Sequence, residues 1–166
     1  MSISLIVAAG SNNEIGKNNT LIWHMPADMK FFKEKTTGHC IITGRKNYES
    51  IPEKFRPLPG RTNIVITRQK DYSAPGAIVV NSVDTALAQA EKLGEKEVFI
   101  IGGAEIYHQS FNKLDKLYIT HVDESFEADT FFPEFNKNNW SLESKELFQA
   151  DNNNKYDCAF CVYSKR

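Results

Sequence analysis

Short hydrophobic runs of strand length alternate along the chain with segments that have a helical pattern. The runs cover residues 2–9, 40–43, 62–67, 77–80, 97–101, 115–122, 140–149 and 156–164. The helical segments cover Pro26 to Lys35, Lys46 to Ile51, Val83 to Lys92 and Ala104 to Phe111. Strands that alternate with helices imply right-handed crossovers. We therefore predict an α/β fold, in which a central, mainly parallel, twisted sheet carries helices on both faces.

The pattern changes near the C-terminus, where the helical segments stop. A cluster of turn residues from Asp151 to Lys155 separates the last two hydrophobic runs, so we expect the sheet to end in an antiparallel hairpin. Two longer connections precede it: Gly10 to Trp23, which has the polar composition of a lid, and the proline-rich segment Pro52 to Arg61. In open α/β sheets ligands bind beyond the carboxyl ends of the strands, so we expect the site there.

Asp28 interrupts the apolar side of the first predicted helix, which Pro26 can begin. At about 100° per residue, Asp28 falls within an arc that is otherwise hydrophobic. The arc consists of Met25, Met29, Phe31 and Phe32. A carboxylate in apolar surroundings needs a hydrogen-bonding partner, and a ligand can supply it. The alternative is that Asp28 caps the free N–H groups of the first helical turn.

Composition narrows the class of protein. The chain has 166 residues, of which 41% are hydrophobic and 25% charged, as expected for a single domain over residues 1–166. The net charge of -1 without a basic run gives no indication of nucleic-acid binding. The hydrophobic start is too short to span a bilayer and has no basic leader. We therefore expect no membrane association and a cytoplasmic location.

The cysteines and histidines give no indication of a disulfide framework or a metal. Three cysteines are present, and Cys158 and Cys161 lie in an alternating stretch where residues three apart point to opposite faces. The four histidines are scattered without the spacing of metal ligands. We predict ordinary thiols and no metal.

Three strand ends combine features that suit a phosphate-containing ligand. One carries Gly102 and Gly103 before a helix, the second continues into Gly44-Arg45-Lys46-Asn47, and the third into Thr67-Arg68. Glycines allow backbone N–H groups to approach phosphate, and the cations favour a dinucleotide with an extra ribose phosphate. The alternative is that these cations are solvated surface charges. The first strand-to-helix turn lacks G-x-G-x-x-G, and no Walker motif occurs, so a standard Rossmann dehydrogenase and a kinase are disfavoured.

Taken together, the motifs resemble the dihydrofolate reductases of the bacterial chromosomal type over nearly the full chain. The matching pieces are Ile3 to Ala8, Ile15-Gly16, Trp23, Pro26-Ala27-Asp28, Gly44-Arg45, Glu49-Ser50-Ile51, Pro57 to Arg61, Ile101-Gly102-Gly103, Tyr107, Leu117 to Thr120 and Asp129 to Pro133. The resemblance implies reduction of 7,8-dihydrofolate to tetrahydrofolate with NADPH, for one-carbon metabolism. It also implies binding of antifolates, and we expect a monomer.

The resemblance assigns roles by position. It implies that Asp28 holds the 2-amino and ring N–H groups of the pterin, with Thr120 beside it through water, and it adds Trp23 and Leu21 to the catalytic set. Hydride then arrives at C6, and solvent admitted under the lid is the implied proton donor for N5. The other implied substrate contacts are Ile6, Phe32, Ile51, Leu58, Arg61 and Ile101, where Arg61 grips the glutamate α-carboxylate. We expect burial to raise the pKa of Asp28.

The implied cofactor contacts fall into three groups. The nicotinamide and lid contacts are Ala8, Ile15, Gly16, Asn19 and Thr20. The adenosine phosphate contacts are Arg45, Lys46, Asn47, Thr67 and Arg68. The diphosphate loop comprises Gly102, Gly103, Ala104, Glu105, Ile106, Tyr107 and Gln109, although Tyr107 also suits a plain helix-packing aromatic.

Four positions depart from the family pattern. Ile22 stands where a proline often occurs, Asn47 where a threonine is commoner, Ala104 where a third glycine is frequent, and Asn81 where a lysine is sometimes found. We expect altered cofactor affinity or lid kinetics and retained activity. Two other classes remain open: the related reductase domain of riboflavin synthesis, and a nucleotide-binding module without catalysis in which Asp28 is only a helix cap.

Overall fold

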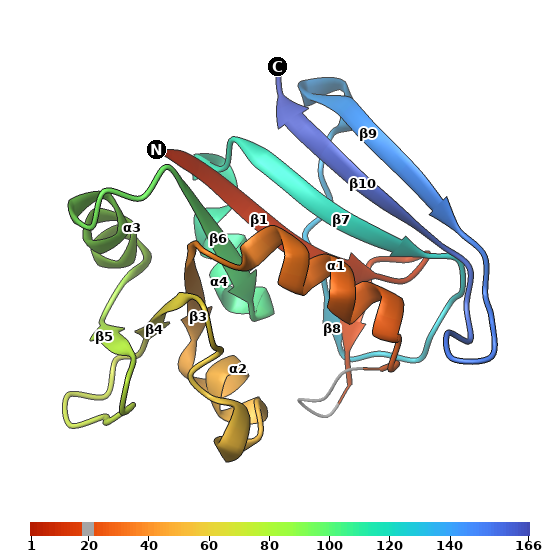
Figure 1. Ribbon diagram of the computed structural model, residues 1–166. Coiled ribbons are helices and arrows are strands. Elements are labelled where there is room, and N and C mark those ends of the chain that lie inside the picture. The colour runs from red at the N-terminus through yellow and green to blue at the C-terminus, as the bar shows by residue number, and fades with distance from the viewer. Residues whose placement is uncertain (18–21) are drawn as a thin grey trace.

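One twisted sheet of eight strands runs through the part of the chain that the structure describes (Figure 1). The computed structural model describes residues 1–17 and 22–166. In spatial order the strands are β5 (Ile78–Val80), β4 (Thr62–Ile66), β3 (Cys40–Gly44), β6 (Glu97–Gly102), β1 (Ser2–Ala9), β7 (Lys116–Val122), β10 (Cys158–Lys165) and β9 (Trp140–Phe148). Pairing is parallel from β5 to β7 and antiparallel at β10 and β9. The predicted fold class, including its C-terminal hairpin, is confirmed.

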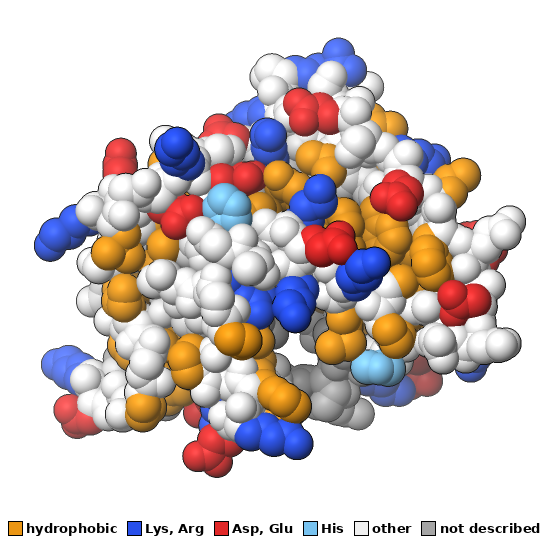
Figure 2. All heavy atoms as spheres, in the orientation of Figure 1, with side chains coloured by type: hydrophobic (Ala, Val, Ile, Leu, Met, Phe, Trp, Pro, Cys, Tyr) orange, Lys and Arg blue, Asp and Glu red, His pale blue; other side chains and the backbone are white. Residues whose placement is uncertain are grey.

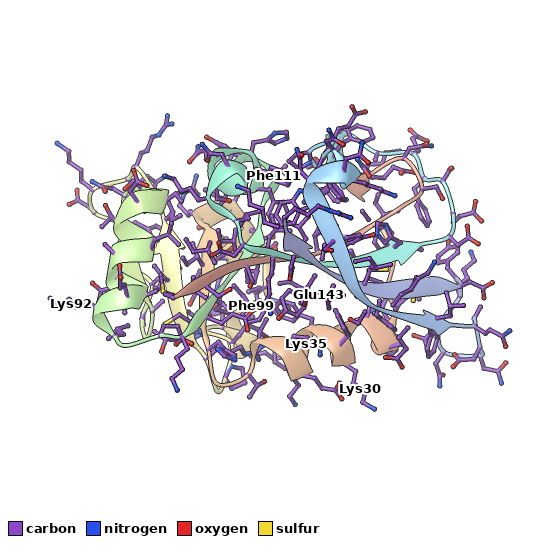
Figure 3. All side chains as sticks on the ribbon, turned by 90° about the horizontal axis from the view of Figure 1, so that it is seen from above. Lys30, Lys35, Lys92, Phe99, Phe111 and Glu143 are labelled. Carbon is purple, nitrogen blue, oxygen red and sulfur yellow. The ribbon has the colours of Figure 1, made fainter. Side chains whose placement is uncertain are left out.

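The four predicted helices are present, within about one residue of their expected bounds. They are α1 (Pro26–Thr36), α2 (Arg45–Ser50), α3 (Val83–Lys92) and α4 (Ala104–Ser110). Short 3₁₀ turns follow at Glu53–Phe55, Phe111–Lys113 and Lys137–Asn139. Figure 3 shows α1 on one side of the sheet and α4 on the other, with Phe99 towards α1 and Phe111 on the opposite side.

Alternation along the strands divides the core between the two faces. On β1, Leu5 and Val7 belong to the large cluster that α3 and α4 cover, whereas Ile6 belongs to the cluster against which Phe31 and Phe32 of α1 pack. Complete burial of a side chain such as Leu5 contributes about 1.5–3 kcal/mol. Both faces of the sheet are therefore shielded from solvent at β1, as parallel sheets require.

The cysteines follow the same alternation. Cys158 packs with Met25 and Val122, and Cys161 lies in the large cluster on the other face, so the prediction that they point to opposite faces is confirmed. All three cysteines are free thiols. No helix in residues 1–17 and 22–166 is long and apolar enough to cross a membrane.

A second, small sheet was not predicted. It pairs β2 (Glu14–Gly16) with β8 (Thr130–Phe131) in antiparallel orientation. The interpretation of Gly10 to Trp23 as loop throughout is therefore wrong over residues 14–16. Strands of three and two residues are too short to show an alternating pattern in a sequence. The lid prediction itself includes residues 18–21, which lie outside the described part of the chain.

The start of α1 is secured by a residue distant in the sequence. The backbone N–H of Ala27 donates to Oδ1 of Asn154, at 2.9 Å, in the turn between β9 and β10. Asn154 is buried, and Asp151 accepts hydrogen bonds from its backbone and amide. A free N–H group of the helix start is thus satisfied by the C-terminal hairpin, which leaves Asp28 available for another role.

Candidate functional site

The predicted site residues converge where the parallel strands end at their carboxyl side. The ends of β1, β3, β4 and β6 lie side by side there because the strands pair in register. Figure 2 shows a hollow on this face, between the surfaces over α1 and α2, bordered by hydrophobic side chains and by Lys and Arg side chains. The hollow lies where open α/β sheets bind their ligands.

Asp28 lies on the sheet side of α1, and its side chain contacts β7. The hydroxyl of Thr120 donates to Oδ1 of Asp28 over 2.7 Å, directly and not through water. The cap position of α1 is Met25, which has no side-chain capping bond, and Asp28 does not fill that role. Asp28 lies in the first turn of α1, where its charge suits the helix dipole, but among the described residues its side chain bonds to Thr120 and not to a helix N–H group. One part of the predicted arc is wrong: Met29, at its margin, is 56% exposed.

The electrostatics of Asp28 follow from its burial. Burial raises the pKa of this carboxyl above its ordinary value, and the hydrogen bond from Thr120 opposes the rise without cancelling it. The negative charge in turn helps to raise the pKa of the nearby Tyr107 hydroxyl and Cys158 thiol, although burial is the larger cause for both. The ionised carboxylate has one neutral donor from the described residues, so it is poised to accept further N–H groups.

Hydrophobic side chains form the walls on both sides of Asp28. On one side Trp23 packs against the cluster that contains Met25 and Phe160. On the other side, the predicted substrate contacts Phe32, Leu58 and Ile101 pack on the cluster that contains Ile6. Ile51, the remaining apolar contact, packs instead with Tyr48 and Val65, next to α2.

Arg61 is held in a fixed position at the far end of this wall. Its Nε donates to the carbonyl of Pro59 over 2.9 Å, and its Nη1 donates to the hydroxyl of Thr36 over 3.1 Å. The guanidinium carbon lies 5.8 Å from the centre of the Phe32 ring. Burial lowers the pKa of Arg61. Because the ordinary pKa of a guanidinium is very high, the group nevertheless stays charged. Such a guanidinium is pre-organised to receive a carboxylate.

The glycine turn after β6 is hydrogen-bonded to β3 at Gly102 and has free space at Gly103. The Gly102–Gly103 peptide is cis, and the Gly102 carbonyl accepts from the hydroxyl of Thr43, which accepts in turn from the amide of Asn47. Gly102 has φ of 130°, and a Cβ there would lie 3.3 Å from the Asn47 amide nitrogen. A Cβ on Gly103 would meet nothing within 4 Å. The turn thus offers backbone to a ligand without a side chain in the way.

The cations expected near an adenosine phosphate lie at the ends of β3 and β4. Arg45 pairs with Glu49 over 2.6 Å, and the 89% exposed side chain of Arg68 lies 3.9 Å from Glu105. Lys46 is exposed on α2. The hydroxyl of Thr67 accepts the backbone N–H of Gln69. The residues are brought to one edge, and the interpretation of Arg68 as a solvated charge stays open.

The other predicted cofactor residues divide by exposure. On α4, Glu105 and Gln109 hydrogen-bond to each other on the exposed side, and Ala104 begins the helix. Ile106 and Tyr107 point into the core, where the Tyr107 hydroxyl donates to the Ile6 carbonyl over 2.9 Å. Their side chains pack in the core, as the alternative for Tyr107 proposes, and the Tyr107 hydroxyl also borders the glycine turn at Gly102.

The predicted nicotinamide contacts that the structure describes come from β1 and β2. Ala8 pairs in register with Thr120, which places it next to Asp28. Ile15 and Gly16 lie on β2, and the Gly16 carbonyl accepts from the backbone of Asp129. Three predicted residues, Asn19, Thr20 and Leu21, lie outside the described residues.

Two further residues, which no pattern in the sequence identifies, support this region. Glu14 is a buried carboxylate that accepts the backbone N–H of Phe126, and the Phe126 ring packs on Trp23. A glutamate in a polar, asparagine-rich stretch is typical of an exposed loop, so no pattern identified it. Only the tertiary structure reveals its burial.

The fold and the crevice together define an enzyme of the nucleotide-dependent reductase class. A family model described as dihydrofolate reductase matches residues 2–165. The chain therefore belongs to the dihydrofolate reductase family, which consists of NADPH-dependent oxidoreductases that reduce dihydrofolate to tetrahydrofolate. This assignment excludes the two other classes considered, the riboflavin-type reductase and the binding module without catalysis.

Individual relatives agree over the full length. The dihydrofolate reductase of Haemophilus influenzae is 43% identical over 166 residues and covers 100% of both chains. That of Bacillus subtilis is 45% identical and covers 99% of this chain and 95% of its own. A structure of the dihydrofolate reductase from Enterococcus faecalis, complexed with NADP(H) and RAB-propyl, has a TM-score of 0.91 at 38% identity, covering 99% and 96% of the two chains.

The raised pKa of Asp28 predicts a pH-dependent effect on stability. Because the folded pKa lies above the unfolded one, stability falls as the pH rises from the unfolded pKa through the folded pKa, and above the folded pKa the ionised carboxylate destabilises the ligand-free fold by the full amount. Asp28→Asn keeps an acceptor for Thr120 without the charge, so we expect a higher Tm than wild type at pH 7. The gain should shrink as the pH falls towards the ordinary value of 3.8. Each kcal/mol corresponds to roughly 2–4 °C in a domain of this size.

Thermal unfolding of both proteins between pH 4 and pH 8 provides the measurement. Asp71→Asn, at an exposed position, is the matched control and should change Tm little at any pH. A Tm of Asp28→Asn at or below that of wild type at pH 7 would contradict the assignment of an energetically costly charge.

Proposed function

We propose that the crevice binds the pterin of 7,8-dihydrofolate against Asp28 and reduces it at C6. The observation that carries the proposal is the hydrogen-bonded pair of half-buried Asp28 and buried Thr120 beside the hydrophobic walls. Since Thr120 occupies only one position around Oδ1, the remaining lone pairs of the carboxylate are available to the 2-amino and ring N–H groups of the pterin. Such donors replace the water that burial removes.

The ring position follows from the walls around that carboxylate. The pterin edge lies between Ile6 and Ile101, and the aminobenzoyl ring extends along Phe32, Leu58 and Ile51. Arg61 then receives the α-carboxylate of the glutamate through its free N–H groups. A substrate held at both ends presents C6 in one orientation, which lowers the entropy cost of the reaction.

When bound, NADPH supplies the hydride for this reduction. The residues fit that cofactor: the open backbone at Gly103 accommodates the diphosphate, and Arg45, Lys46 and Arg68 provide positive charge for its extra ribose phosphate. Asn47, Thr67, Gly102, Ala104, Glu105 and Gln109 complete the proposed contacts. Ala8, Ile15 and Gly16 border the reacting ring.

The proton for N5 comes from solvent. Asp28 contacts the opposite edge of the pterin, so its role is to orient and polarise the ring, and Trp23 shields the reacting edge from bulk water. The raised pKa of Asp28 brings this polarising group closer to the working range of acid-base chemistry. Leu21, in the segment outside the described residues, completes the proposed catalytic set.

We further propose that residues 1–166 form one domain that works as a monomer in the cytoplasm. The eight-stranded sheet joins the first strand to the last, and every proposed contact comes from this one chain. Three free cysteines suit a reducing compartment. Antifolates with an amino-substituted ring should compete with dihydrofolate at Asp28.

Replacing Asp28 by Asn tests the catalytic assignment. The amide cannot accept both pterin donors, so we expect kcat/KM for dihydrofolate to fall about 100-fold or more. The Kd for NADPH should stay within about twofold, because the cofactor contacts lie elsewhere. Steady-state NADPH oxidation and fluorescence titration measure the two quantities. Unchanged turnover would refute the role of Asp28.

Replacing Arg61 by Lys tests the carboxylate contact. A lysine loses the forked geometry and the two bonds that fix it, so we expect the KM for dihydrofolate to rise about tenfold and the KM for NADPH to stay unchanged. Arg166→Lys is the control, since Arg166 donates its Nε to the Trp140 carbonyl at the end of the C-terminal hairpin, away from the proposed substrate wall. Equal effects of Arg61→Lys on both KM values would count against the contact.

A further inference from the structure

Glu14 is a buried carboxylate that the proposed reaction does not use. It is 1% exposed and begins β2. Its Oε1 accepts the backbone N–H of Asn12, and its Oε2 accepts the backbone N–H of Phe126. Within residues 1–17 and 22–166, no Lys, Arg or His nitrogen forms an ion pair with it. Among the described residues, backbone N–H groups are therefore what balances its charge.

The carboxylate is ionised in spite of its burial. Burial raises the pKa of Glu14, but the backbone N–H groups of Phe126, Glu14 itself and Asn12 outweigh it, and the pKa lies below its ordinary value. Hydrogen bonds to a charged group are stronger than neutral ones, and each that is lost leaves a buried group unsatisfied. The arrangement thus holds three backbone positions in one geometry.

These bonds join two segments far apart in the sequence, residues 10–17 and residues 123–132. Backbone bonds lie along the same contact: Ser11 donates to the Glu124 carbonyl over 2.9 Å, and Phe132 donates to the Asn13 carbonyl over 2.8 Å. A Cβ on Gly10 would lie 3.0 Å from Oε1, so the absence of a side chain at Gly10 provides the room that the carboxylate occupies.

Each of the two segments that Glu14 joins is connected to residues of the proposed site. The Phe126 ring lies 5.0 Å from the Trp23 ring, centre to centre, and Trp23 packs with Met25 directly before α1 and Asp28. In the other direction, β2 continues from Glu14 into Ile15 and Gly16. The one carboxylate therefore connects the Trp23 side of the crevice with its nicotinamide side.

We propose that Glu14 is a positioning residue for the hydride step, which acts through Phe126 on Trp23 and through β2 on Ile15 and Gly16. It touches neither substrate nor cofactor. The proposal rests on the proposed function and deepens it, because it states which group outside the crevice fixes the distance between the two reacting rings.

A surface ion pair across the same two segments provides a matched control. Lys17 and Glu127 lie 2.6 Å apart, and the Glu127 side chain is 86% exposed. An exposed pair of this kind contributes little to positioning. Glu14→Gln and Glu127→Gln thus remove one negative charge each from the same contact, one buried and one exposed.

The experiment measures hydride transfer in a single turnover at saturating NADPH and dihydrofolate. Glutamine has the shape of glutamate, but its NH₂ group cannot accept from a backbone N–H. We expect Glu14→Gln to slow hydride transfer about tenfold, since small displacements of reacting groups have large effects on rate. The Kd for NADPH should stay within about threefold, because the adenosine side is held at β3 and β4. Glu127→Gln should leave both unchanged.

A spectroscopic readout accompanies the rates. In a Trp140→Phe background Trp23 is the remaining tryptophan, so its emission reports its surroundings directly. The emission should shift in Glu14→Gln and stay unchanged in Glu127→Gln. Phe126→Leu keeps the backbone N–H bond but removes the ring contact, and it should both shift the emission and slow hydride transfer.

The outcomes separate the possibilities. A lower Tm of Glu14→Gln with wild-type hydride transfer would show a purely structural role and overturn the proposal. If Glu14→Gln does not fold, Phe126→Leu decides: wild-type rate and emission overturn the proposal, and a slower rate with shifted emission supports it. If the wild-type protein oxidises no NADPH with dihydrofolate, the proposed function fails, and the positioning proposal is overturned with it. If only the positioning role is wrong, the wild-type protein still oxidises NADPH with dihydrofolate, and Glu14→Gln transfers hydride at the wild-type rate.

Discussion

The hydrogen bond from Thr120 to Asp28 is the contact on which the site depends, because it fixes a carboxylate where burial opposes its charge. The one neutral donor among the described residues does not compensate a half-buried carboxylate, and the remaining lone pairs of Asp28 favour a ligand with N–H groups. The same residue thus makes the free protein less stable and the substrate complex more specific. Stability is given up locally for binding, a common feature of functional sites.

The rest of the fold keeps the two partners together. Thr120 lies on β7, which pairs with β1 on one side and with β10 on the other. Asp28 lies on α1, and the start of α1 is satisfied by Asn154, from the turn that β10 follows. Since the C-terminal hairpin supports both the strand and the helix, it contributes to the site although it supplies none of the proposed contacts.

Much of this architecture was predictable because it depends on repeating patterns. The longer strands and the four helices have enough residues to show a period, and Asp28 stood out because it broke one. Features that depend on a single tertiary contact were not predictable: the short strands β2 and β8, the exposed Met29 at the margin of an apolar arc, and the burial of Glu14 and Asn154. In each case a polar or apolar residue type gave one expectation and a distant part of the chain decided otherwise.

The most direct test of the central claim is a carbon-13 NMR titration of the Asp28 carboxyl, with and without a bound pterin that offers 2-amino and ring N–H donors. We expect a midpoint above the ordinary value of 3.8 in the free protein, because burial disfavours the charge. Binding should lower the midpoint, since the new donors stabilise the ionised form. A midpoint at or below 3.8 in the free protein, or one that binding leaves unchanged, would contradict the account.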